Sequence, residues 1–181
     1  MNTRICILFT MIVGALLSTG LATAQDPSSE SNAIEKLREL KGMIEKDDDL
    51  PGSPAAGVYL TRNSFYSGIP SVGDKHLELL PHVKNLAIVD LGFCSRVTDR
   101  GMKELGVLKN LSALNLRRTY ISDAGLRELR ALKNLAYLDL AFTKITDAGL
   151  KELGEFENLV CLDLSDTRLC FESHLGLNLP M

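Results

Sequence analysis

The chain has 181 residues, a formal net charge of −3 and 45% hydrophobic residues, which predicts one domain with a sizeable core. This mildly acidic balance offers no electrostatic footprint for nucleic acid or for an anionic membrane surface, so both are disfavoured as partners. The cysteines Cys6, Cys94, Cys161 and Cys170 form no C-x-x-C pair and no zinc-ligand spacing, and they indicate neither a metal site nor a complete disulfide framework.

Residues 1–24 are typical of a secretory signal peptide. Arg4 provides a positive start, residues 5–17 form an apolar run, and Ala22, Thr23 and Ala24 form a small-residue cleavage pattern. The alternative is an uncleaved anchor, although the run is short of a typical membrane span. We expect export across the cytoplasmic membrane, to the periplasm, the cell envelope or the medium, with no membrane insertion after cleavage.

Residues 25–54 predict a short helix, a linker and together a cap for whatever follows. Asn32 and Glu35 have the spacing of a capping box, and apolar residues continue at helical spacing, namely Ile34, Leu37 and Leu40. Residues 43–46 are compatible with a strand, and residues 47–54 with a turn or linker. The alternative for this whole segment is a disordered stalk.

The second half of the chain repeats itself. The phrase TKITDAGLKEL at residues 143–153 has a near copy, TYISDAGLREL, at residues 119–129, and weaker copies begin at Val72 and Val97. Val97, Ile121 and Ile145 are 24 residues apart. A fixed period of this size predicts a solenoid whose units bury their leucines against one another.

Each unit opens with the spacing L-x-x-L-x-L, as in residues 111–116, 135–140 and 159–164. Apolar residues that alternate over so short a run predict a strand with one buried face, so Asn115, Asp139 and Asp163 are expected to point outward.

The repeated phrase then predicts a short helix in each unit. Thr146 is expected to cap it, Asp147 to lie in its first turn, and Leu150 and Leu153 to share one face. Gly149 recurs as Gly101 and Gly125, which indicates close packing against the neighbouring unit.

These features resemble the leucine-rich repeat family over residues 55–168. Residues 91–102 look like the cysteine-containing subtype, and the other copies look like its bacterial T-D-A-G-L relatives. The resemblance implies an α/β solenoid with short parallel strands on a concave face, short helices on a convex face, and binding on the concave side. It also implies that Cys94 and Thr119 turn inward to hydrogen-bond loop backbone, as do Thr143 and Thr167.

Both ends depart from the repeat pattern. Residues 61–71, TRNSFYSGIPS, predict a loop insertion in the first unit, and residues 169–181 are interpreted as a degenerate C-terminal cap or a truncated repeat.

Outward positions of the strands and turns are the candidate protein-binding residues. Stacked repeats predict one ladder of Asp90, Asn115, Asp139 and Asp163, and a second of Phe93, Arg118, Phe142 and Asp166, with Arg117 and Tyr137 nearby. Arg118 is expected between two aromatic rings, and aromatic and arginine side chains are typical interface anchors. The alternative for the first ladder is that L-D-L is the usual strand sequence of the family and has no binding role. The alternative for the second is that Arg118 only screens the two rings from water.

The chain lacks the H-E-x-x-H, G-x-S-x-G and phosphate-loop motifs, and its histidines lie outside any metal or nucleophile motif. We therefore expect an exported, non-catalytic protein-binding or scaffold module with no cofactor. The alternatives are a small cell-envelope hydrolase or thiol enzyme, which would need a reactive Cys161 or an unrecognised site in the tail, and a purely structural role.

Overall fold

A computed structural model describes residues 27–40, 43–46, 55–60 and 72–169. The expected signal peptide, the insertion at 61–71, Cys170 and the tail after it lie outside these residues. Within the part of the chain that the structure describes, no helix has the length and apolar character needed to span a membrane.

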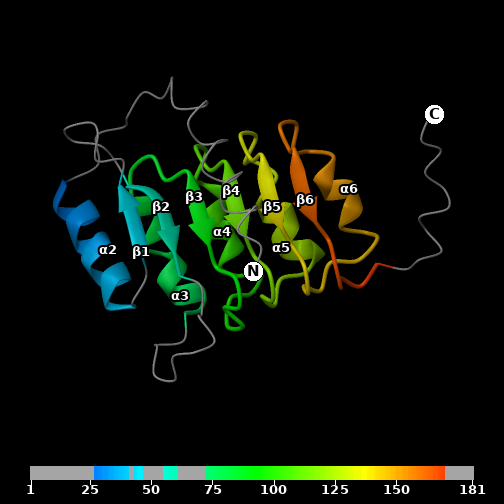
Figure 1. The fold of residues 1–181 in the computed structure, drawn as a ribbon, viewed down its shortest axis with the longest axis horizontal. Helices are drawn as coiled ribbons and strands as arrows, with labels where there is room; N and C mark the ends of the chain where they lie inside the picture. Colours follow the sequence, from blue (N-terminus) through cyan, green and yellow to red (C-terminus); the bar gives the residue numbers. More distant parts are fainter. Residues whose placement is uncertain (1–26, 41–42, 47–54, 61–71, 170–181) are drawn as a thin grey trace.

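One sheet of six strands, arranged in sequence order, runs the length of the molecule (Figure 1). Its strands are β1 (Met43–Lys46), β2 (Ala55–Tyr59), β3 (Ile88–Asp90), β4 (Ala113–Asn115), β5 (Tyr137–Asp139) and β6 (Cys161–Asp163). The strand β1 pairs with β2 in antiparallel fashion, and every later pair is parallel. The expected strand at residues 43–46 is therefore confirmed, as is the parallel sheet of a solenoid.

Short helices lie on one face of this sheet, behind the strands in Figure 1. They are α3 (Asp74–Leu77), α4 (Met102–Gly106), α5 (Asp123–Glu128) and α6 (Leu150–Leu153), with a 3₁₀ turn η1 (Leu80–His82) after α3. Helices this short are not stable alone, so packing on the sheet maintains them. We call the opposite face of the sheet, which these helices leave uncovered, the strand face.

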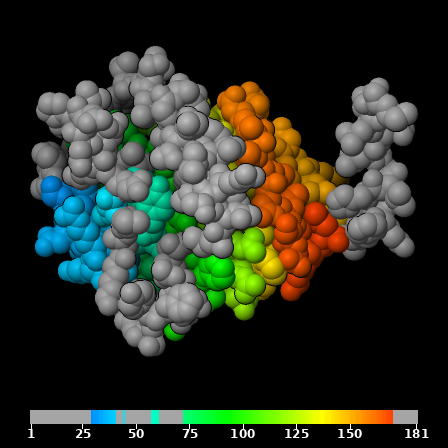
Figure 2. Space-filling view, in the orientation of Figure 1, coloured from blue at the N-terminus to red at the C-terminus, as the bar shows by residue number. Residues whose placement is uncertain are grey.

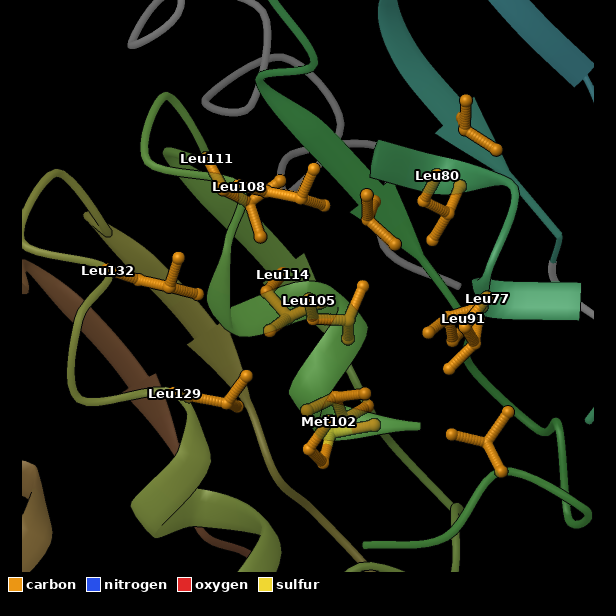
Figure 3. Packing of buried hydrophobic residues seen from close by; sticks show 14 of the residues in the cluster. Leu77, Leu80, Leu91, Met102, Leu105, Leu108, Leu111, Leu114, Leu129 and Leu132 are labelled. Carbon is orange, nitrogen blue, oxygen red and sulfur yellow. The ribbon is translucent and has the colours of Figure 1, made fainter. Parts of the chain in front are cut away.

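The core lies between the helices and the sheet and is continuous from repeat to repeat. Leu114 and Leu116 of the fourth strand region are fully buried, as the alternating spacing predicts. Figure 3 shows Leu105 of α4 beside Leu114, and Leu77 of α3 beside Leu91. Each helix therefore contributes leucines that pack onto the strand of its own or the next repeat.

The N-terminal helix α2 (Pro27–Glu39) packs on the first repeat, at the end of the molecule opposite the last repeat (Figure 2). Its Ile34 and Leu37 are buried in the same core. Glu30 accepts a hydrogen bond from the backbone N–H of Lys84 at 3.2 Å and lies 3.5 Å from its ammonium group. The expectation that Asn32 caps this helix is wrong, because the helix extends back to Pro27 and Asn32 is exposed within it.

An aspartate joins each repeat to the next. Asp99 accepts hydrogen bonds from the backbone N–H and the hydroxyl of Ser122, at 2.7 and 2.6 Å, and from the N–H of Gly125 at 3.1 Å. Asp74 does the same for Thr98, and Asp123 for Thr146. A side chain on Gly125 would collide with the Asp99 carboxylate, which confirms the close packing expected of these glycines.

The last helix begins later than the sequence predicts, because Thr146 lies in the junction between two repeats and does not cap the helix. The hydroxyl of Thr146 accepts a hydrogen bond from the N–H of Ala148 at 3.3 Å, but the helix α6 itself begins at Leu150, with Gly149 before it. In the preceding repeat Ser122, at the position that corresponds to Thr146, caps α5 directly by accepting a hydrogen bond from the N–H of Ala124. The hydroxyl of Thr146 also donates a hydrogen bond to Asp123 of the preceding repeat. This bond between repeats was not predicted from the sequence.

Candidate binding surface

The side chains of the first ladder, at the ends of the strands, stabilise the turns that follow the strands. The side-chain oxygens of Asp90, Asn115, Asp139 and Asp163 each accept a hydrogen bond from the backbone N–H two residues later, at 2.8 to 3.0 Å. This is the local bond by which aspartate and asparagine stabilise a turn. Asp139 alternates with the inward Leu138 and Leu140, as the spacing predicts, but it is only 7% exposed, so its outward direction does not bring it into solvent.

The pKa values of the carboxylates in this ladder are shifted in different directions. Burial raises the pKa of Asp90 and of Asp139, because removing a carboxylate from water disfavours its charged form. The pKa of Asp163 is lowered, chiefly by the hydroxyl of Ser165 that donates to it. Burial, followed by the neighbouring carboxylates, raises the pKa of Tyr137 to about 12. These charges therefore influence one another across the strand face.

Beside this ladder lies a small apolar cluster that the sequence reasoning missed. Ile88 and Ala113 are each 5% exposed, and Tyr59 and Tyr137 pack against them. Ile88, Ala113 and Tyr137 are paired residues of β3, β4 and β5. The sequence carried the necessary information, because these residues alternate with the inward leucines just as the aspartates do. Only Tyr137 had been included among the candidates.

The second ladder occupies an unusual backbone conformation. Phe93, Arg118, Phe142 and Asp166 have φ values of 65°, 55°, 59° and 54°. Bulky side chains rarely adopt this left-handed region, so the surrounding structure must impose it. Hydrogen bonds to the next repeat do so: the N–H of Phe93 donates to Arg117, that of Arg118 to Ala141 and that of Phe142 to Ser165, at 2.8 to 2.9 Å.

Arginines and aromatic rings of this ladder are stacked. The guanidinium carbon of Arg118 lies 5.3 Å from the ring centre of Phe93 and 4.4 Å from that of Phe142, which confirms its expected position between the two rings. Arg117 lies 4.7 Å from the ring centre of Phe142, and its guanidinium nitrogen is 3.6 Å from a carboxylate oxygen of Asp163. Arg117 therefore links the two ladders.

A buried row separates this ladder from the residues that follow it. The hydroxyls of Thr119 and Thr143 donate to the backbone carbonyls of Leu116 and Leu140, each at 2.6 Å. The thiol of Cys94 donates to the carbonyl of Leu60 at 3.2 Å and is 3% exposed. These inward contacts agree with what the leucine-rich-repeat resemblance implied. Cys161 is half-buried on β6. Among the described residues, no cluster of three or more histidine, cysteine, aspartate or glutamate side chains could hold a metal ion.

Comparison with protein families finds one match. A family profile described as Leucine Rich repeat matches residues 131–154. No curated protein matches the chain.

Two solved structures are similar to the chain at low identity. The leucine-rich-repeat ectodomain of the plant membrane receptor kinase GASSHO1/SCHENGEN3 from Arabidopsis thaliana, in complex with CASPARIAN STRIP INTEGRITY FACTOR 2, has a TM-score of 0.44 and 15% identity, over 76% of this chain and 21% of that one. Internalin C2 from Listeria monocytogenes has a TM-score of 0.40 and 18% identity, over 83% of this chain and 73% of that one. This chain thus spans 21% of the receptor ectodomain. The family profile matches one repeat, and the period of the sequence and the parallel sheet with its short helices show that the chain folds as an α/β solenoid of the leucine-rich-repeat type.

Proposed function

We propose that the chain is an exported, non-catalytic module that binds a protein partner through the strand face and the turns at its edge. The observation that carries this proposal is the stack in which Arg118 lies between the rings of Phe93 and Phe142. Phe93 is 41% exposed, although its side chain is large and apolar. Arginine and aromatic residues contribute most of the binding energy at many protein interfaces.

The rigidity of this stack favours binding further. Side chains that become ordered on association lose conformational entropy, at about 0.5 to 1.5 kcal/mol each. The backbone of Phe93, Arg118 and Phe142 is already held by hydrogen bonds to the next repeat, and their side chains already contact one another. Much of that entropy is therefore lost before a partner arrives.

Export and the bacterial T-D-A-G-L subtype belong to this proposal as well. They rest on the sequence of residues 1–24 and on the repeated phrase. Mass spectrometry of the protein after export tests the first, with a mature chain expected to begin near Gln25. A mass that retains residues 1–24, together with fractionation into membranes, would show that an uncleaved anchor is the correct alternative.

Partner capture with matched variants tests the binding face. The wild-type chain is compared with a variant carrying Arg118→Ala and Phe142→Ala, and with a control carrying Lys103→Ala and Lys151→Ala on the helical side. Truncation of one interface anchor is expected to cost about 2 kcal/mol of binding, which is roughly thirtyfold in dissociation constant. The control should change affinity by less than about threefold, since exposed charges contribute little.

Circular dichroism first establishes that each variant is folded. If the partners survive the loss of Arg118 and Phe142 with unchanged affinity, and are lost with the control pair instead, the proposed binding face is wrong.

A further inference from the structure

Two outward rows of side chains flank the inward-pointing row of Cys94, Thr119, Thr143 and Thr167. The first is the ladder already described, Phe93, Arg118, Phe142 and Asp166. The second, which follows the inward-pointing row, is Arg96, Tyr120, Lys144 and Arg168. Backbone bonds of 2.9 Å, from the N–H of Tyr120 to Val97, of Lys144 to Ile121 and of Arg168 to Ile145, keep the second row in register. We call the two rows together the basic rim.

The charge of the basic rim is opposite to that of the whole chain. Its cations are Arg96, Arg118, Lys144 and Arg168, and its one acid is Asp166, whereas the chain has a formal net charge of −3. Aromatic rings lie between the cations, and Tyr120 is 53% exposed. The rim is therefore a local positive and aromatic surface on an acidic protein.

Two of the four rim cations, Arg118 and Lys144, lie against aromatic rings. The ammonium group of Lys144 lies 4.5 Å from the ring centre of Tyr120, and Arg118 stacks on two phenylalanines. Among the described residues, no carboxylate forms an ion pair with any of the four rim cations, while on the helical side Arg127 and Arg130 share Glu152.

The stacking leaves these cations able to bind an anion. A ring occupies the flat face of a guanidinium, whereas its N–H donors point outward in the plane. Arg118 thus keeps donors available for a carboxylate while the rings fix its position. The ammonium group of Lys144 has three N–H donors and contacts one ring, so it also keeps donors available for a carboxylate.

We propose that the basic rim binds an acidic peptide segment of the protein partner, an inference that rests on the proposed protein-binding function. Adjacent strands lie about 4.8 Å apart and an extended peptide advances about 3.4 Å per residue. Glutamate or aspartate residues two or three positions apart can therefore reach cations of nearby repeats. Apolar residues between them would contact the exposed rings of Phe93 and Tyr120.

A peptide fits the surroundings of the rim better than a uniformly charged polymer does. The neighbouring strand face carries Asp90, Asp139 and Asp163, and Asp166 lies within the rim itself. These carboxylates would repel a polyanion that has a charge at every unit, such as a sulfated glycan. A peptide places its carboxylates only beside the cations and neutral residues elsewhere.

Fluorescence anisotropy with defined peptides tests the inference on the full chain. The probes are a labelled peptide of alternating glutamate and leucine, the same peptide with glutamine in place of glutamate, and a labelled heparin fragment. The glutamate peptide is expected to bind about tenfold more tightly than the glutamine peptide, and its affinity should fall as sodium chloride is raised.

Charge reversal then locates the site. Lys144→Glu with Arg168→Glu should weaken the glutamate peptide by about tenfold or more, whereas Lys103→Glu with Lys151→Glu, an equal change in net charge on the helical side, should change it by less than about threefold. Equal binding of the two peptides, equal effects of the two variants, or tighter binding of heparin than of the glutamate peptide would overturn the inference.

A failure here is distinguishable from a failure of the proposed function. A captured partner that depends on Arg118 and Phe142, but binds the Lys144→Glu, Arg168→Glu variant unchanged, overturns the acidic-peptide inference and leaves protein binding intact. Partners that are indifferent to Arg118 and Phe142 overturn the proposed function, and the inference with it.

Discussion

Two repeats with the same leucine spacing differ in how deeply their leucines are buried. Leu114 of β4 is fully buried, whereas Leu162, at the corresponding position of β6, is 40% exposed. The strand β4 has parallel neighbours on both sides, while β6 is paired only with β5 among the described strands. The sequence of a repeat thus specifies which residues belong to the core, but the repeats on either side determine how completely those residues are buried from solvent.

The largest expected effect tests this comparison directly. Leu114→Ala should lower the free energy of unfolding by about 3 kcal/mol, because it leaves a cavity that the flanking repeats cannot fill. Leu162→Ala should cost only about 1 kcal/mol, because part of its surface is already in water. Urea unfolding of both variants measures the difference, and equal losses would contradict the role given to the neighbours.

A pair of glycines sharpens the same contrast. Gly125→Ala should destabilise the fold by about 2 kcal/mol, since the new side chain collides with the Asp99 carboxylate of the preceding repeat. Gly154 has helical dihedral angles, and a side chain there would meet only the carbonyl of Lys151 at 3.6 Å. Gly154→Ala should therefore stabilise by up to about 1 kcal/mol. Thermal unfolding of both variants must show opposite signs for this account to hold.

The inward threonines should show a smaller difference. Thr119→Val removes the hydroxyl that donates to Leu116 in a 3% exposed site, and is expected to cost about 1 kcal/mol. Thr167, which makes the equivalent bond to Leu164 at 2.8 Å in the last repeat, is half-buried, and water can replace its hydroxyl. Thr167→Val should cost about half as much. A larger loss at Thr167, measured by denaturant unfolding, would contradict the comparison.

The smallest expected difference lies in the response to pH. The pKa of Asp139 is raised above its usual 3.8, so the folded chain holds more protons than the unfolded chain between 3.8 and the raised value. Stability therefore falls as pH rises through that window. The pKa of Asp163 is lowered, so its contribution is present above 3.8 and is lost as pH falls through the lowered value.

Asparagine variants separate these two contributions. Asp139→Asn keeps an oxygen for the Ala141 N–H, as Asn115 does for Arg117 in the wild type, and should be more stable than the wild type above the window. Asp163→Asn should be less stable than the wild type at neutral pH and approach it in acid. Melting temperatures of both variants from acid to neutral pH provide the measurement, and a shift of the same sign in both would refute the assignment.

Much of the fold and part of the candidate surface followed from the sequence. The period predicted the solenoid, alternation predicted the buried Leu114 and Leu116, and the register predicted Arg118 between Phe93 and Phe142. The start of α2 was wrong because Asn32 and Glu35 have capping spacing within a helix that already continues through them. A short motif cannot show whether the residues before it are also helical.

The features that remained hidden depend on contacts between repeats. The bonds from Asp99 to Ser122 and Gly125, the burial of Asp139 and the second row of the basic rim all require the position of a neighbouring unit in space. Residue type and spacing determine which way a side chain points within its own repeat, because that direction follows from local backbone geometry. Only the tertiary structure decides what each side chain then meets, because the partner lies about one repeat away along the chain, and its distance and burial depend on how the solenoid is stacked.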